Sequence, residues 1–150
     1  MELIISKKPF SISTNARIFY RIIQLLLIMH YTGRSDKKTV PLMKIHLLIW
    51  ALQSNEREYL LLKSKNSNYE ISIGIWNIDK NTNQALTYMH EDDLCSIDKK
   101  NYSLTENGNN LVKKIMDDKT IFIEEKQFLK KIGSSLTETN ITKLQNLWIS

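Results

Sequence analysis

The segment 94–112 constrains the fold most, because it joins a short strand pair to a helix without a spacer. Two short apolar stretches within 94–104 flank the polar turn Lys99-Lys100-Asn101, which predicts a β-hairpin. Thr105 follows directly and can cap a helix through its hydroxyl group. Gly108 falls in the first turn of that helix, where the missing side chain lets the helix lie close to the strand. The rest of the chain must supply the core on which this unit packs.

Apolar residues recur at helical spacing over most of the chain, which predicts helices joined by short loops. The first expected helix begins after the possible N-caps at 13–15 and ends at about Tyr31. The others run from Pro41 to about Gln53 and over about 56–65, 80–91, 105–117, 121–132 and 139–148. The period changes only once before the hairpin, where Ile71, Ile73 and Ile75 alternate with Ser72, Gly74 and Trp76. A two-residue repeat of this kind predicts a strand or an extended segment.

The order helix, extended segment, helix, hairpin, helix is typical of a winged-helix domain. Residues Tyr102-Ser103-Leu104-Thr105-Glu106-Asn107-Gly108-Asn109-Asn110-Leu111-Val112 match the Tyr-x-Leu-Thr-x-x-Gly-x-x-Leu-Val pattern that closes many such domains. Any strand that leads into a threonine-capped helix can look similar, so the pattern alone does not decide the fold. We expect a mainly α chain with a small β-hairpin: a winged-helix-like core over 1–117, and a helical extension over 118–150 packed on it.

Composition and charge narrow the cellular setting. The chain has 150 residues and one cysteine, Cys95, which excludes an internal disulfide and a thiolate metal cluster and favours the cytoplasm. The most apolar stretch, 22–29, is far shorter than the ~20 residues of a bilayer span, and no signal peptide is evident, so no membrane partner is expected. The net charge of +5 is concentrated in residues 1–50, with eight lysines and arginines against two acidic residues. Such a region is typical of a surface that attracts nucleic acid or an acidic protein face, and equally of an ordinary solvated surface.

Several segments together resemble a known family. They are Lys8-Pro9-Phe10 before a long helix, Leu47-Leu48-Ile49-Trp50-Ala51-Leu52, Asp79-x-x-x-Asn83-x-Ala85-Leu86-x-Tyr88, and the Tyr102–Val112 pattern. This order resembles the small middle component of ABC-three-component systems, which include the Lamassu-type anti-phage defence complexes. The resemblance implies a non-enzymatic winged-helix subunit beside an SMC-like coiled-coil ATPase and an effector, often a nuclease. The acidic-Gly-Leu sequence usual before the wing is here Glu91-Asp92-Asp93-Leu94, without its glycine.

Residues that carry catalysis or bind metals are sparse. Four scattered glycines provide no phosphate-binding loop, and His30, His46 and His90 lack ligand partners at helical spacing. We therefore expect no enzyme activity, no cofactor, no metal and no small-molecule substrate. One competing pattern is Glu124-Glu125-Lys126, the half-motif of many metal-dependent nucleases, with Asp117-Asp118 upstream. The other interpretation of these residues is a helix start with acids in its first turn.

Two groups of polar residues are candidate binding sites. For nucleic acid, the candidates lie on the helix 80–91 and at the wing tip: Lys80, Asn81, Asn83, Gln84, Lys99, Lys100 and Asn101. For protein partners, the candidates are the basic residues of the N-terminal third: Lys7, Lys8, Arg17, Arg21, Arg34, Lys37 and Lys38. The acidic end Glu91-Asp92-Asp93 of the first group repels phosphate, which favours protein docking. The alternative function is a stand-alone winged-helix transcriptional regulator, and contact with DNA through the complex is left open.

Overall fold

The fold is mainly α, as the sequence predicts. The computed structural model describes residues 14–34 and 38–148, and these are 64% helical, with seven helices and one three-stranded antiparallel sheet. In chain order the elements are α1 (Thr14–Thr32), β1 (Val40–Pro41), α2 (Leu42–Leu52), α3 (Asn55–Asn66), α4 (Lys80–Glu91), β2 (Cys95–Asp98), β3 (Asn101–Leu104), α5 (Glu106–Asp117), α6 (Ile123–Ile132) and α7 (Glu138–Asn146). No helix within these ranges is long and apolar enough to span a membrane.

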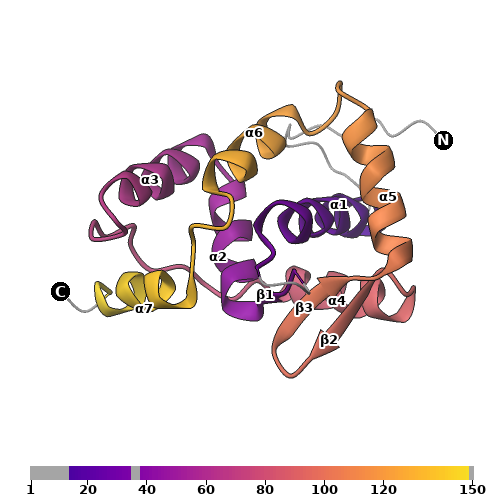
Figure 1. The fold of residues 1–150 in the computed structure, drawn as a ribbon, viewed down its shortest axis with the longest axis horizontal. Helices are drawn as coiled ribbons and strands as arrows, with labels where there is room; N and C mark the ends of the chain where they lie inside the picture. Colours follow the sequence, from indigo (N-terminus) through magenta and orange to yellow (C-terminus); the bar gives the residue numbers. More distant parts are fainter. Residues whose placement is uncertain (1–13, 35–37, 149–150) are drawn as a thin grey trace.

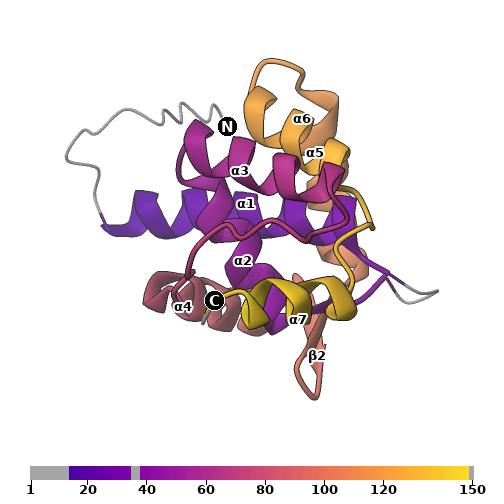
Figure 2. The same ribbon diagram turned by 90° about the vertical axis from the view of Figure 1, so that its left-hand side faces the viewer.

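Helix α1 lies at the centre of the fold, and α2, α4, α5 and α6 pack against it (Figure 1). Helices α3 and α6 lie on one side of α1, and α4 and α7 lie on the other (Figure 2). The stretch 25–28 is fully buried because helices surround it on several sides. Its continuous apolar sequence is thus typical of a helix that contacts neighbours on all faces.

The predicted hairpin is present and forms part of a larger sheet. Strand β3 pairs with β2, so that Cys95 lies opposite Leu104, and it also pairs with β1, so that Val40 lies opposite Tyr102. Strand β1 was not predicted, because two residues give no periodicity to detect. Pro41, predicted as the first helical residue, is the second residue of β1, and α2 begins one residue later. Strand β3 is thus the central strand of the sheet, and α4 packs against β2.

Gly108 has the role that the sequence predicts. A Cβ atom at this position would lie 2.0 Å from the carbonyl oxygen of Leu94, far closer than real Cβ contacts. The Thr105 hydroxyl accepts the Gly108 N–H at 3.1 Å and caps α5. Helix α5 can therefore start directly against the base of the hairpin only with glycine here.

The alternating segment before α4 is extended but forms no strand. Its side chains also do not follow the predicted two-residue repeat, because Ile73 and Trp76 are buried whereas Ile71 and Ile75 are exposed. Ile71 and Ile73 differ in exposure although they lie two residues apart, and Gly74 follows them with a φ of +87°, a conformation that is readily available to glycine. The sequence predicted a strand or an extended segment, and no strand forms here.

The segment 118–148 is part of the same core as the preceding residues. Helix α6 packs against α1 and α3, and α7 packs against α2. Phe128, Leu129, Ile141 and Leu144 are buried in the cluster that also contains the α1 and α2 side chains. The C-terminal helices thus close the side of the core that the sheet leaves open.

Candidate functional site

Helix α4 is the element that carries most of the candidate site residues. Its inner face buries Thr82, Ala85, Leu86 and Met89 against the core. Its outer face is exposed, and Figure 1 shows the helix behind the hairpin, directly below α1. In a winged-helix arrangement this helix is the one available to a partner.

A polar cluster fixes the N-terminal end of α4 to α1 and α2. Arg21 of α1 forms an ion pair with Asp79 at 3.2 Å and donates to Gln24 at 2.8 Å. Asp79 caps α4 by accepting the Asn81 N–H at 3.1 Å, and its other oxygen accepts the Thr82 hydroxyl at 2.9 Å. Because these contacts occupy Arg21, this predicted protein-binding residue serves the fold instead of an open surface.

His46 of α2 completes this cluster. Its Nδ1 accepts the Asp79 N–H at 3.3 Å, which places the remaining proton of a neutral ring on Nε2. Burial lowers the His46 pKa, and the nearby Asn83 side chain and Asp79 carboxylate oppose that effect. Nε2 makes no hydrogen bond of good geometry to any described residue. Asn83, a predicted DNA-contacting residue, therefore has its side chain beside this ring.

The other predicted nucleic-acid residues divide into two exposed groups. Lys80, Asn81 and Gln84 are exposed on α4, and Lys99 and Lys100 are exposed at the wing tip. Asn101 is half-buried in the sheet, opposite Asp98 on one side and Pro41 on the other. The exposed cations are thus few, and the acidic stretch 91–93 at the other end of α4 is fully exposed.

The predicted protein-binding cations do not form one surface. Arg17, Arg34 and Lys38 are exposed, but α1 separates the first from the other two by about 25 Å of helix. Arg34 donates a hydrogen bond to the Ser134 carbonyl and so ties the end of α1 to the α6–α7 connection. The remaining members Lys7, Lys8 and Lys37, and the Lys8-Pro9-Phe10 element, lie outside the described residues.

An apolar groove opens between α1 and the C-terminal half of α4. It is lined by Ile18, Phe19, Ile22 and Tyr88 and has a volume of about 180 Å³. Tyr88 retains 43% of its exposure, and the three α1 residues are only partly buried. Helical periodicity in the sequence does not distinguish a covered apolar face from one that is left open. The sequence signal for this groove was the pairing of these α1 residues with Tyr88, a tyrosine two turns into α4.

A second exposed apolar site lies at the N-terminal end of α4. Ile75 and Ile78, in the extended segment before the helix, retain 62% and 65% of their exposure. Helix α4 rises about 12 Å between Lys80 and Tyr88, so the isoleucines before the helix and the tyrosine lie toward its opposite ends. Both isoleucines are thus exposed apolar side chains near the N-terminal end of α4.

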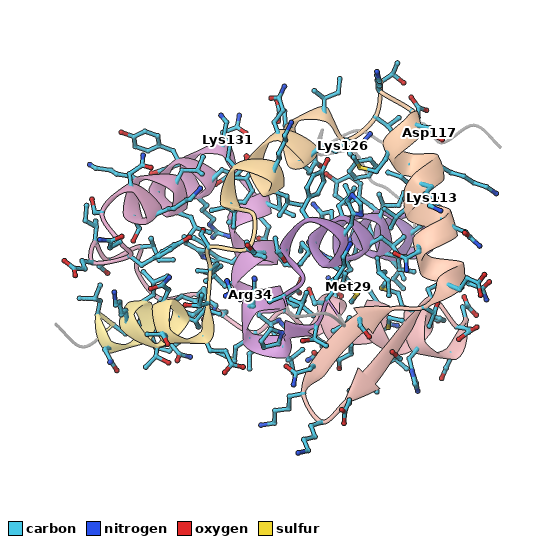
Figure 3. All side chains as sticks on the ribbon, in the orientation of Figure 1. Met29, Arg34, Lys113, Asp117, Lys126 and Lys131 are labelled. Atoms are coloured by element: carbon cyan, nitrogen blue, oxygen red, sulfur yellow. The ribbon has the colours of Figure 1, made fainter. Side chains whose placement is uncertain are left out.

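The nuclease-like half-motif is engaged in packing. Lys126 donates to the carbonyl oxygens of Ile115 and Asp118 at 2.8 and 2.7 Å, next to the end of α5 that carries Asp117 (Figure 3). Burial lowers the Lys126 pKa against the opposing effect of Asp118. Glu125 is buried and accepts the Tyr20 hydroxyl at 2.8 Å. These side chains follow the helix-start interpretation, and no group of three potential metal ligands occurs within 14–34 and 38–148.

Cys95 is a small core residue. It is 2% exposed, and burial raises the pKa of its thiol to about 11.

Comparisons of the chain with protein-family models, with curated proteins and with solved structures found no match.

Proposed function

We propose that this chain is a non-catalytic binding subunit that works by docking to other proteins through α4 and its neighbours. The observation that carries the proposal is the open apolar groove of Ile18, Phe19, Ile22 and Tyr88, next to the acidic stretch 91–93. Apolar anchors rimmed by charge are what a protein interface requires at its centre. A helix that reads DNA instead presents a basic stripe to phosphate.

The bridging role follows from two separated surfaces. The groove lies at the C-terminal end of α4, and the exposed pair Ile75 and Ile78 lies at its N-terminal end. The polar cluster around Asp79 holds α4 rigidly between them, so that both surfaces keep a fixed mutual geometry. A rigid element with a docking site at each end suits a subunit that joins two different proteins.

The partner class follows from the resemblance of the chain to the middle component of ABC-three-component systems. We propose that the chain is a cytoplasmic accessory subunit that bridges or regulates an SMC-like coiled-coil ATPase and an effector in an anti-phage defence complex. In this role the partners supply ATP hydrolysis and effector chemistry, and this chain supplies binding energy and geometry. Contact with DNA is made through the assembled complex.

The test is to purify the natively expressed, affinity-tagged chain and identify what co-purifies in stoichiometric amount. The expected result is an SMC-like ATPase together with one effector protein. A matched pair of variants makes the result specific: Ile78→Glu alters the exposed apolar pair, and Ile123→Glu alters an exposed isoleucine at the start of α6. Loss of one partner with Ile78→Glu alone supports bridging. Recovery of the chain alone contradicts the proposal.

A second function has specific support and a clear discriminator. The exposed residues Lys80, Asn81 and Gln84, with Lys99 and Lys100 at the wing tip, match the surfaces that a winged-helix regulator uses on DNA. Such a regulator forms a homodimer and binds a palindromic operator. A dimer in solution that protects one genomic site from nuclease digestion would favour this alternative.

A further inference from the structure

The groove between α1 and α4 is shaped for side chains that project from a helix. Ile18 and Ile22 are one helical turn apart on α1 and so form one continuous apolar wall, and Tyr88 of α4 forms the facing wall. A volume of about 180 Å³ exceeds the ~150 Å³ that accommodates a benzene ring in a protein interior. One or two branched or aromatic side chains can therefore enter, at the spacing that an amphipathic helix provides.

The charge beside the groove selects among such helices. Glu91 lies one turn after Tyr88 and on the same face of α4, and Asp92 and Asp93 follow it in the exposed turn. The negative end of the α4 helix dipole adds further negative potential there. This end of the groove therefore favours a cationic side chain.

The acidic turn is held in a defined conformation. The N–H groups of Asp92 and Asp93 bond to the carbonyl oxygens of Tyr88 and His90. The Thr105 hydroxyl donates to the Asp93 carbonyl oxygen, and Asn107 donates to the Asp93 carboxylate at 2.9 Å. Among the described residues Glu91 and Asp92 have no ion-pair partner, so their charges are available to a ligand.

Arg17 of α1 is exposed one residue before Ile18, but it is not among the residues that line the groove. The electrostatic polarity of the groove therefore comes from the acidic stretch 91–93 at one end of α4. A charge at one end of an apolar groove orients a bound helix, because only one direction brings a cationic side chain to that end.

We propose that this groove binds an amphipathic helix of a partner protein, with apolar anchors at i, i+3 or i+4 and a lysine or arginine placed beside Glu91. The inference rests on the proposed protein-docking function and names the chemistry of one partner. The apolar anchors fill the space between Ile18, Ile22 and Tyr88. The cationic side chain of the bound helix lies at the acidic end of α4 and so determines the direction in which the bound helix lies in the groove.

The test titrates the full chain with a leucine–lysine amphipathic peptide and with the same peptide in which glutamate replaces lysine. Binding is followed by amide chemical shifts, which identify the site. Tyr88→Glu is compared with Tyr59→Glu, since both tyrosines are exposed on helices, at 43% and 64%. Glu91→Lys is compared with Asp117→Lys, since each is the exposed last residue of a helix, α4 and α5.

The expected result is binding of the lysine peptide with shifts at Ile18, Ile22 and Tyr88. Glu91→Lys weakens binding about threefold to tenfold, which is the effect of reversing an exposed charge at an interface rim, and Asp117→Lys leaves it unchanged. Tyr88→Glu abolishes binding, and Tyr59→Glu does not. Equal binding of the glutamate peptide, no binding of the lysine peptide, or equal effects of the paired variants would overturn the proposal. Self-association abolished by Tyr88→Glu would also overturn it, because the occupant would then be a second copy.

The same variants separate this inference from the function on which it rests. If the native complex assembles and both Tyr88→Glu and Glu91→Lys leave it intact, the groove inference is wrong and the docking function stands. If no complex forms but the lysine peptide binds in the groove with the expected shifts, the defence-complex proposal is wrong and the groove inference stands.

Discussion

The close approach between α5 and the hairpin makes Gly108→Ala a demanding test of the fold. The added Cβ would lie 2.0 Å from the Leu94 carbonyl oxygen and 3.1 Å from a methyl group of Leu104. Because the nearer atom belongs to the backbone, no side-chain rotation relieves the overlap. The start of α5 must move by about 1 Å to restore an ordinary contact distance.

The cost of that movement follows from the contacts it stretches. Overpacking of this kind costs about 1–3 kcal/mol, and the Thr105 N–H bond to the Leu94 oxygen, now 3.1 Å, contributes about 1 kcal/mol. Alanine gains about 1 kcal/mol over glycine inside a helix, which offsets part of the loss. We expect a net decrease in the free energy of unfolding of about 2 kcal/mol.

The measurement is chemical denaturation combined with a thermal melt, with Asn109→Ala as the control on the same turn. For a chain of this size about 2 kcal/mol lowers the Tm by about 4–8 °C. Asn109 is exposed, so its replacement should change the stability by less than about 0.5 kcal/mol. A Gly108→Ala protein as stable as the parent or more stable would refute the close packing of α5 on the hairpin.

Three further predictions concern buried groups. Burial lowers the pKa of Lys44 to about 8, so between pH 8 and 10.5 the unfolded chain binds more protons at this residue and the contribution of Lys44 to stability rises with pH. In denaturation curves over this range, the parent should therefore gain about 2 kcal/mol of unfolding free energy relative to Lys44→Met. A constant difference between the two proteins would contradict this prediction. Cys95 should react with Ellman's reagent at pH 8 about a hundredfold more slowly in the folded than in the denatured chain, and equal rates would show that the thiol is exposed. Lys126→Met should lower the free energy of unfolding by about 1–2 kcal/mol, because the carbonyl groups at the end of α5 lose their hydrogen-bond donor. An unchanged thermal unfolding curve would mean that these hydrogen bonds contribute nothing to stability.

The sequence predicts the helices and the hairpin well, because their signals are local. Thr105 and Asp79 are N-cap residues that the sequence predicts, and each accepts a hydrogen bond from a backbone N–H two or three residues later in the chain. Helix α4 has the predicted bounds, since its buried positions Ala85, Leu86 and Met89 follow a clear helical period. The role of Gly108 could be predicted because glycine is a poor helix former, so its presence in a first turn indicates a close backbone contact.

The surface around α4 was harder to predict because exposure depends on tertiary packing. Ile18 and Ile22 have the same periodicity as the buried residues of α1, and only the position of α4 leaves them open. Arg21 was predicted as a cation available to a partner, but the fold brings Asp79, which is distant in sequence, into an ion pair with it. The segment before α4 alternates in sequence but not in exposure, since Ile73 is buried whereas Ile71 and Ile75 are exposed.

The central claim is that this chain docks on proteins and contributes only weakly to DNA binding. The most direct measurement is a salt titration of two affinities of the same preparation, one for duplex DNA and one for the co-purified ATPase partner. Few exposed cations should give weak DNA binding that falls steeply with salt, because counterion release supplies it, whereas an apolar interface should keep the protein affinity nearly constant. Tight, sequence-selective DNA binding by the isolated chain at physiological salt, with a salt-sensitive protein contact, would contradict the claim.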